Sequence, residues 1–450
     1  MNFASQSMSR RRFLAGSATI GAVTIVPRHV LGGPRHTGAN EKLNIAGIGV
    51  GGMGKHNLSQ LAGENIVALC DVDHQYAAET FKLYPKAKVY KDFRVMLDKE
   101  PEIDAVMIAT PDHTHAVISM EAMRRGKHVY CQKPLTHDVY EARMLAKAAK
   151  EYGVITQMGI QGHSSESVRL VCEWIWAGAI GEVREVDAWC SLSYYPFGHA
   201  YWSSKWSRRP KEEPPVPETL DWDSWIGPAP YRPYHPAYHP GVWRCWWDFG
   251  CGMMGDRGAH TLDSVVWALQ LGQPISIDAT SLGMNPDTHP LASIVTYQFA
   301  ARGKLPPVKL TWYEGLHPPR PVELEDGRRM GHPEGGILFK GSKGVLMAGV
   351  YGEGARLIPE SRMKEYQQPA KTLPRVEGSH EQDWVRACKS GKPAGADFAY
   401  SGPLTEICLL GNVAKRMDTR IEWDGDAMKV TNLPEANQYV RASYREGWSL

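Results

Sequence analysis

The feature that most constrains the fold is KLNIAGIGVGGMG, residues 42–54, in which an apolar segment runs directly into closely spaced glycines. Gly49, Gly51 and Gly54 match the pattern G-x-G-x-x-G. In this pattern the first glycine permits a tight turn, the second lets the backbone approach a pyrophosphate, and the third lets a helix pack on the strand. The stretch therefore predicts a strand over 43–48, a turn, and a helix whose free N–H groups bind phosphates.

A second apolar segment, NIVALCDVD, predicts the next strand and ends in Asp71, 20 residues after Gly51. An acidic side chain at this place accepts hydrogen bonds from the ribose hydroxyls of a dinucleotide. No arginine follows Asp71 closely to hold a 2′-phosphate. The two segments together predict a site for NAD rather than NADP.

The alternation of strands and helices continues to residue 158. Strands are expected at 105–109, 128–131 and 155–158, separated by helices at 114–125 and 138–152. This order predicts a doubly wound parallel sheet, with ligands at the carboxyl ends of its strands. The predicted cofactor contacts are Gly49, Gly51, Gly52, Met53, Gly54, Asp71, Thr110, Pro111, Asp112, Gln132, Lys133 and Gln161.

Beyond residue 160 the pattern changes, because five strand-like segments between 181 and 349 lack alternating helices. Such segments are typical of an antiparallel sheet. The fold class is therefore α/β, with an N-terminal Rossmann domain and a C-terminal α/β domain whose open sheet is mainly antiparallel. The expected organisation is a leader and linker over 1–40, the Rossmann domain over 41–160, a substrate and oligomerisation domain over 161–430 with an insertion over 190–247, and a tail over 431–450.

The segment DFGCGMMGDRGAHTLDSVVWAL places Asp256 and His260 at positions i and i+4 of an expected helix, on one face. An isolated pair with this spacing is usually a solvated ion pair. A carboxylate beside a histidine can also orient the ring and stabilise the imidazolium, which suits a general base. Asp263, one turn further, is expected to be a structural partner.

The insertion is rich in aromatic residues and proline, and eight of the 15 tryptophans fall between Trp189 and Trp247. Two interpretations stay open: a surface that stacks on sugar rings, or a lobe that serves packing or oligomer contacts. Polar groups available in the insertion are His199, Arg208, Arg232 and His239. Predicted substrate contacts are His163, Tyr194, Trp243 and Arg257.

The segments ATPDHTH and GKHVYCQKPL resemble the Gfo/Idh/MocA oxidoreductases, which carry T-P-N-x-x-H followed by E-K-P. The resemblance adds His115 to the cofactor contacts and implies that Lys133 reaches both nicotinamide and substrate. It also implies that Asp256 and His260 form a catalytic pair. Gln132 replaces the glutamate of the motif and removes a negative charge beside Lys133.

The resemblance implies an NAD-dependent oxidoreductase acting on a sugar, glycoside or cyclic polyol. In this scheme a ring carbon gives hydride to the nicotinamide, His260 held by Asp256 takes the hydroxyl proton, and Lys133 stabilises the alkoxide. One alternative is an NAD-dependent glycosidase that oxidises the sugar at C3, eliminates the aglycone and returns the hydride. Another is a non-catalytic binding protein of the same fold. A homo-oligomer is also implied.

Residues 9–26, SRRRFLAGSATIGAVTIV, place three arginines before fourteen uncharged residues. This run is shorter than the roughly 20 apolar residues that a membrane span needs. The order of its parts resembles a twin-arginine signal, S-R-R-x-F-L, and predicts export to the periplasm. Because free NAD is scarce there, we expect a tightly bound cofactor.

Charge and cysteine content exclude other classes of protein. The net charge of +2 argues against nucleic acid as a partner. The eight cysteines contain no C-x-x-C pair and no metal-binding spacing. Whether Cys245 and Cys251 form a disulfide stays open at this level.

Overall fold

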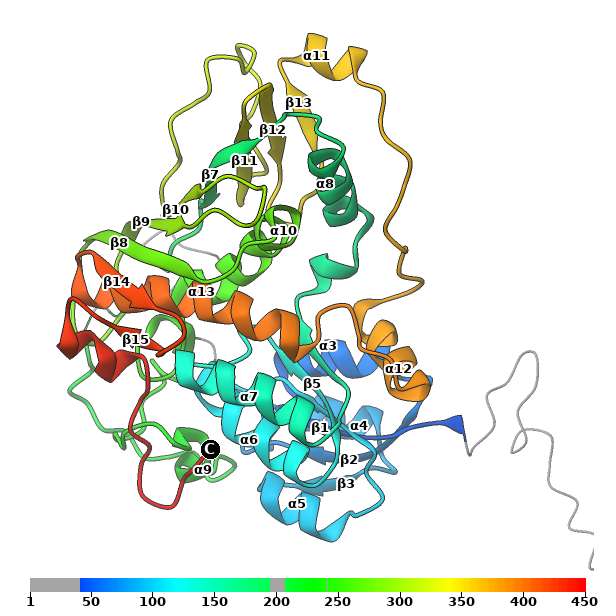
Figure 1. The fold of residues 1–450 in the computed structure, drawn as a ribbon. Helices are drawn as coiled ribbons and strands as arrows, with labels where there is room; N and C mark the ends of the chain where they lie inside the picture. The colour runs from blue at the N-terminus through cyan, green and yellow to red at the C-terminus, as the bar shows by residue number, and fades with distance from the viewer. Residues whose placement is uncertain (1–40, 195–205, 207, 241) are drawn as a thin grey trace, which may run out of the picture. The chain divides into compact units, whose positions relative to one another are not determined.

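The computed structural model describes residues 41–194, 206, 208–240 and 242–450. The predicted leader over 1–40 and His199 lie outside the described residues. Residues 43–450 form one structural unit, built on two sheets (Figure 1).

The first sheet has six parallel strands in the order β3-β2-β1-β4-β5-β6. This is the doubly wound order, and it confirms the predicted Rossmann fold. The strand order changes direction beside β1, so the expected ligand crevice lies at the carboxyl ends of β1 and β4. The strands are β1 Asn44–Ile48, β2 Asn65–Cys70, β3 Lys88–Tyr90, β4 Ala105–Ile108, β5 His128–Gln132 and β6 Thr156–Gly159.

Helices cover both faces of this sheet, because successive side chains of its strands point to opposite sides. On β1, Ala46 and Ile48 pack into one apolar cluster with α5, α6 and α7, whereas Ile45 packs into a second cluster with α3 and α12. The helices are α3 Gly52–Gln60, α4 Ala78–Leu83, α5 Phe93–Lys99, α6 Asp112–Arg124, α7 Val139–Glu151 and α12 His380–Ser390.

The second sheet has nine strands in the order β13-β12-β11-β7-β10-β9-β8-β14-β15. Only the pair β7 and β10 is parallel, so the expected, mainly antiparallel sheet is confirmed as a mixed one. The strands are β7 Val183–Cys190, β8 Pro274–Leu282, β9 Ala292–Phe299, β10 Val308–Glu314, β11 Gly335–Gly341, β12 Gly344–Ala348, β13 Arg356–Ile358, β14 Ile421–Asp424 and β15 Lys429–Val430.

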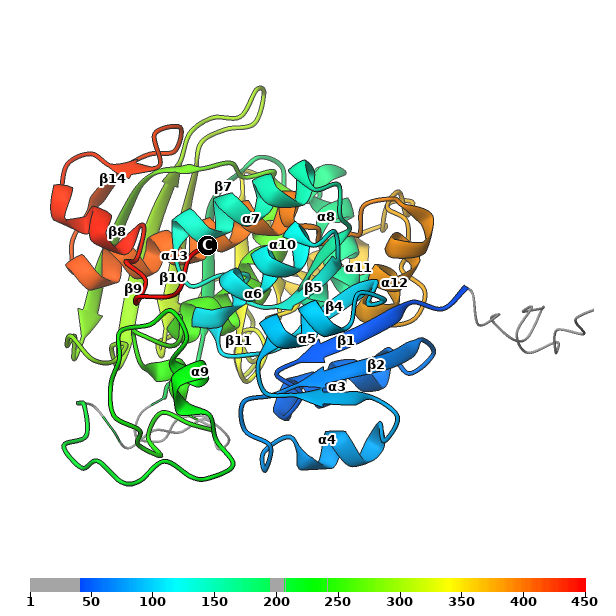
Figure 2. The same ribbon diagram turned by 90° about the horizontal axis from the view of Figure 1, so that it is seen from below.

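Helix α13, Phe398–Met417, joins the two sheets into one core (Figures 1 and 2). It packs against α7 of the Rossmann domain and against β8 of the second sheet. Its Lys415 is fully buried and pairs with Glu314, at the end of β10, with 3.0 Å between Nζ and Oε2. The remaining helices of the second domain are α8 Glu166–Trp176, α9 Trp222–Ile226, α10 Ala259–Leu269 and α11 Glu360–Glu365.

The described part of the insertion folds largely upon its own aromatic side chains. Residues 219–249, hereafter the aromatic lobe, include Trp222 and Trp225, which are both buried and stack with ring centroids 4.7 Å apart. Tyr238 contacts Trp246 and Phe249 edge to face. Most of these rings therefore stabilise the lobe by mutual packing and are not free to stack on a sugar.

All eight cysteines are free thiols, so Cys245 and Cys251 do not pair. Across the described ranges, none of the helices combines the length and the apolar character that crossing a membrane would require.

Candidate active site

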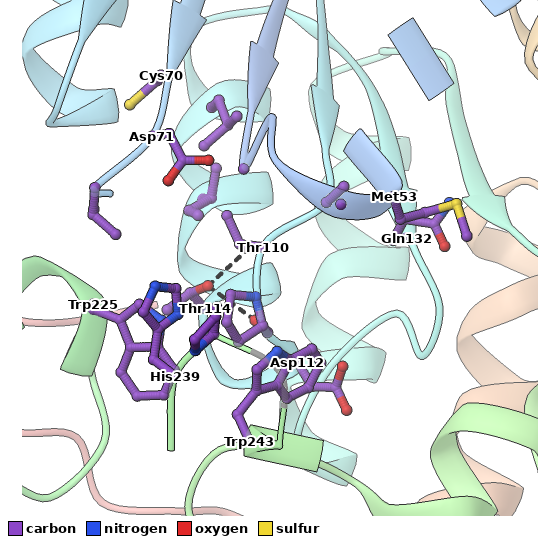
Figure 3. A pocket seen from close by; sticks show the side chains of 18 of the residues that line it. Met53, Cys70, Asp71, Thr110, Asp112, Thr114, Gln132, Trp225, His239 and Trp243 are labelled. Atoms are coloured by element: carbon purple, nitrogen blue, oxygen red, sulfur yellow. Dashed lines mark hydrogen bonds between the residues drawn. The ribbon is translucent and has the colours of Figure 1, made fainter. Parts of the chain in front are cut away.

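A cleft of about 700 Å³ lies along the carboxyl ends of the parallel strands (Figure 3). Its walls come from the Rossmann domain, the aromatic lobe, the second domain and Trp448. The residues predicted from sequence that line it are Gly49, Gly52, Met53, Asp71, Thr110, Pro111, Asp112, Gln132, Lys133, Gln161, Trp243, Arg257 and His260.

The glycine turn leaves no room for side chains at two positions. A Cβ atom on Gly49, which has a φ of +73°, would lie 2.7 Å from the backbone N of Thr110. A Cβ atom on Gly54 would lie 2.0 Å from the carbonyl oxygen of Gly49. Gly49 and Gly54 therefore shape the turn. Of the predicted glycines, Gly51 and Gly54 do not line the cleft themselves. This close approach of strand, turn and helix is what a bound pyrophosphate needs.

Asp71 stands at the end of β2, where its carboxylate faces the glycine turn. Its Oδ2 accepts hydrogen bonds from the backbone N–H groups of Val50 (2.9 Å) and Gly51 (3.3 Å), and its Oδ1 accepts one from Asp73 (3.0 Å). Burial raises the pKa of Asp71 to about 6 despite these backbone donors. Each oxygen retains acceptor capacity for the hydroxyls of a ribose.

We expect NAD affinity to depend on the protonation of Asp71. The ionised carboxylate accepts from ribose hydroxyls, so affinity should be highest above pH 7 and should fall as the pH is lowered through about 6. Calorimetric titration of the cofactor-free protein with NAD from pH 5 to 8 measures this directly. In Asp71→Asn the affinity should be low and nearly independent of pH; a pH dependence identical to that of the unaltered protein would contradict the assignment.

Two side chains near β4 hold the strand ends in place. His115 lies behind the cleft wall, where its Nδ1 and Nε2 each lie 2.8 Å from a carbonyl oxygen, of Pro134 and Thr110 respectively. Both ring nitrogens are engaged with the backbone, and His115 does not line the cleft. Asp112, the first residue of α6, accepts a hydrogen bond from the backbone N–H of Cys251 (2.9 Å) and so ties the two domains together.

Gln132 is held by a hydrogen-bond network that the sequence did not predict. The amide of Gln132 donates to Asn57 Oδ1 (3.0 Å), and the amide of Asn57 donates to Glu381 Oε1 on α12 (2.8 Å). Gln161 donates to the hydroxyl of Tyr130, which also contacts Glu381. Gln132 thus fixes strand β5 beside the helix α3 and does not carry charge into the site.

Lys133 extends from the end of β5 to the second domain. Its Nζ contacts Oδ1 of Asp256 and donates to the carbonyl oxygen of Asp256 at 3.2 Å. Burial, followed by the positive charges of Arg244 and Arg257, lowers the pKa of Lys133 well below its usual value. Asp256 therefore supplies beside the lysine the carboxylate that Gln132 lacks.

Contrary to the expectation from the D-x-x-x-H spacing, the side chains of Asp256 and His260 do not contact each other. Met254–Gly258 forms a π-helical turn before α10, and a π turn holds more residues than an α turn. The spacing i, i+4 consequently does not bring the two side chains together. Instead the ring of His260 lies edge to face against Tyr351, with centroids 5.0 Å apart.

His260 nevertheless lines the cleft beside Lys133. Its Nδ1 has no hydrogen-bond partner among the described residues. Burial, with the neighbouring charge of Lys133, lowers the pKa of His260 well below its usual value. The ring is therefore neutral at neutral pH and able to accept a proton.

The predicted substrate contacts separate into two groups. Trp243 and Arg257 line the cleft, and Arg257 donates to the hydroxyl of Tyr351 (2.7 Å) and pairs with Glu334 (3.0 Å). Tyr194 is buried and does not line it. The remaining predicted contact, His163, does not line the cleft either.

His163 is a structural residue. Its Nδ1 lies 2.8 Å from Oδ1 of Asp263, and its ring stacks on Trp267. Asp263 is thus a structural partner, as the sequence suggested. Among the polar groups of the insertion, Arg232 pairs with Asp248 within the lobe, whereas Arg208 is exposed and His239 lines the cleft.

Fold and site together define a two-domain protein whose first domain is an NAD-binding Rossmann domain. Residues 43–160 match the family model described as an oxidoreductase family with an NAD-binding Rossmann fold. Residues 195–305 match the C-terminal alpha/beta domain of the same oxidoreductase family. The chain belongs to the Gfo/Idh/MocA family, as its motifs indicated.

Curated relatives match one part of the chain. Levoglucosan dehydrogenase of Pseudarthrobacter phenanthrenivorans is 30% identical over 154 residues, which cover 32% of this chain and 39% of the relative. Inositol 2-dehydrogenase of Rubrobacter xylanophilus is 30% identical over 149 residues, covering 32% of this chain and 42% of the relative. The chain thus spans about two fifths of the length of these relatives.

Solved structures share the fold over most of the chain. Levoglucosan dehydrogenase in complex with NADH and levoglucosan has a TM-score of 0.56 and 19% identity, covering 85% of this chain and 99% of that one. The WlbA dehydrogenase of Bordetella pertussis, in complex with NADH and UDP-GlcNAcA, has a TM-score of 0.59 and 16% identity, with coverages of 85% and 99%. At these identities the likeness establishes the fold alone.

Proposed function

We propose that the protein is an NAD-dependent oxidoreductase that moves a hydride between a hydroxyl-bearing carbon of a sugar, glycoside or cyclic polyol and a tightly held nicotinamide. The observation that carries this proposal is the placement of Lys133 and a neutral His260 in the same cleft as the glycine turn and Asp71. The names of the curated relatives support the substrate class, since levoglucosan and inositol are polyhydroxylated rings.

The residues present fit NAD, because the close packing at Gly49 and Gly54 forms the tight turn that a pyrophosphate approaches, and Asp71 faces this turn. When bound, NAD supplies the hydride acceptor. The neutral imidazole of His260 accepts the proton of the substrate hydroxyl at a ring nitrogen. Lys133 donates an N–H from Nζ to the oxygen on which negative charge develops, and Asp256 holds the amine in place.

The test is a panel of levoglucosan, inositols and nitrophenyl glycosides, mixed with the purified protein without added NAD. We expect absorbance of reduced nicotinamide without release of nitrophenol. Release of nitrophenol would instead establish the glycosidase reaction. No reduction by any compound, even with added NAD, would overturn the proposal.

We also propose that residues 9–26 direct export of the folded protein and that the protein is a homo-oligomer. The resemblance to S-R-R-x-F-L supports export. The resemblance to the Gfo/Idh/MocA family supports a homo-oligomer. A reporter fused to residues 1–40 should reach the periplasm and should fail to do so with Arg10→Lys and Arg11→Lys together. Sedimentation equilibrium measures how many copies of the chain associate.

A further inference from the structure

Near Asp71, the cleft is lined partly by residues that do not belong to the Rossmann domain. Trp225 and His239 of the aromatic lobe line the cleft, and Figure 3 shows them across from Asp71. Trp448, from the tail, lines it as well. The glycine turn and Asp71 indicate where the adenosine half of NAD would bind, and these three side chains border that part of the cleft.

The aromatic lobe is fastened to the loop that follows β2. Leu220 forms an antiparallel bridge with Asp73, and the backbone N–H of Asp221 donates to the carbonyl oxygen of Val72 (2.9 Å). The side chain of His239 adds a contact of 2.9 Å between its Nε2 and Oδ2 of Asp73. The lobe is thereby anchored directly beside the acidic residue expected to bind ribose.

The tail is fastened to the lobe and to the Rossmann domain. Arg445 pairs with Asp223 on α9 and donates from Nε to the carbonyl oxygen of Gly227 (3.1 Å). Arg124 of α6 donates to the carbonyl oxygen of Leu450 (2.9 Å). Between these two anchor points the tail carries Trp448.

Trp448 lies against a pair of residues at the start of α5. The guanidinium of Arg94 is 4.8 Å from the indole centroid, and the ring of Phe93 is 6.4 Å away. Phe93 and Arg94 also line the cleft. An indole, a guanidinium and a phenyl ring at one end of a cleft form a surface suited to a flat, aromatic base.

We propose that the aromatic lobe and the tail form a clasp that encloses the adenosine half of NAD, with Trp448 and Arg94 forming the adenine subsite. This inference rests on the proposed function in one respect, the use of NAD as cofactor. The cofactor leaves only when the contacts of Arg445 or His239 open, so its dissociation is slow. The clasp is the physical means by which the nicotinamide is retained between turnovers.

The test measures the dissociation rate of NAD and requires no substrate. The protein is loaded with radiolabelled NAD, chased with excess unlabelled NAD and filtered at intervals. Because stacking of a base on an aromatic side chain contributes about 1–3 kcal/mol, Trp448→Ala should release NAD about 5- to 150-fold faster. The matched control is Trp176→Ala, since Trp176 is a half-exposed tryptophan on α8 outside the cleft.

A second variant separates the clasp from the subsite. Arg445→Met removes one of the two anchors of the tail without altering any residue that lines the cleft, and it should also accelerate release. Rates for Trp448→Ala and Arg445→Met equal to that of Trp176→Ala would overturn the clasp. Slow release from the unaltered protein and fast release from both variants would establish it, even if no sugar reduces the bound cofactor. Reduction by a sugar with unchanged release rates would uphold the proposed function alone.

Discussion

Lys133→Met is expected to lower kcat by about 10²–10⁴-fold, because the variant loses the N–H that stabilises charge on the substrate oxygen. Methionine matches the length of the lysine stem, so the shape of the cleft changes little. The measurement is single-turnover reduction of the bound nicotinamide under excess substrate. NAD should still bind, since the glycine turn and Asp71 are untouched.

The same substitution leaves the carboxylate of Asp256 buried without its cation. Removing one partner of a buried ion pair typically costs about 3–5 kcal/mol of unfolding free energy. The double variant Lys133→Met with Asp256→Asn should therefore regain most of the lost stability while remaining inactive. Near-normal turnover in this double variant would remove Lys133 from the mechanism. Equal instability of the single and double variants would contradict the ion pair.

Lys415→Met is expected to lower the free energy of unfolding by about 3–5 kcal/mol. Lys415 is fully buried on α13, and its Nζ lies 3.0 Å from Oε2 of Glu314. Without the lysine, Glu314 remains as a buried charge without a cation. Urea denaturation of the cofactor-free protein, followed by tryptophan fluorescence, measures the loss.

Two matched variants sharpen this prediction. Lys415→Met with Glu314→Gln removes both charges and keeps an acceptor for the indole N–H of Trp312, so it should recover much of the loss. Lys309→Met breaks an exposed pair with Glu185, which should cost less than about 1 kcal/mol. A loss for Lys415→Met no larger than that for Lys309→Met would show that the buried pair adds little.

Much of the first domain was predictable because its signals are local. The strands around β1, β4 and β5 were placed to within one or two residues, since parallel strands buried on both faces are continuous apolar runs. The parallel pairing of β7 with β10 was not predictable. It joins segments more than a hundred residues apart, and nothing in either segment specifies its partner.

The residues of the site also fall into those that the sequence identified and those that it did not. Asp71 and Lys133 were identified because each follows a strand whose end is readable from the sequence. Arg244, Tyr351 and Trp448 were missed, because they reach the cleft from distant segments. The expected contact of Asp256 with His260 failed because a π turn leaves no mark in a D-x-x-x-H spacing.

The position of Trp448 has a consequence for the order of events during translation. The ribosome makes the glycine turn and Asp71 first, and a Rossmann domain can fold while later segments are still being synthesised. The cleft then lacks Trp225, His260 and Trp448, which follow in that order along the chain. A nascent chain therefore exposes an open half-site, and the proposed clasp can close on the dinucleotide only after Trp448 has left the exit tunnel.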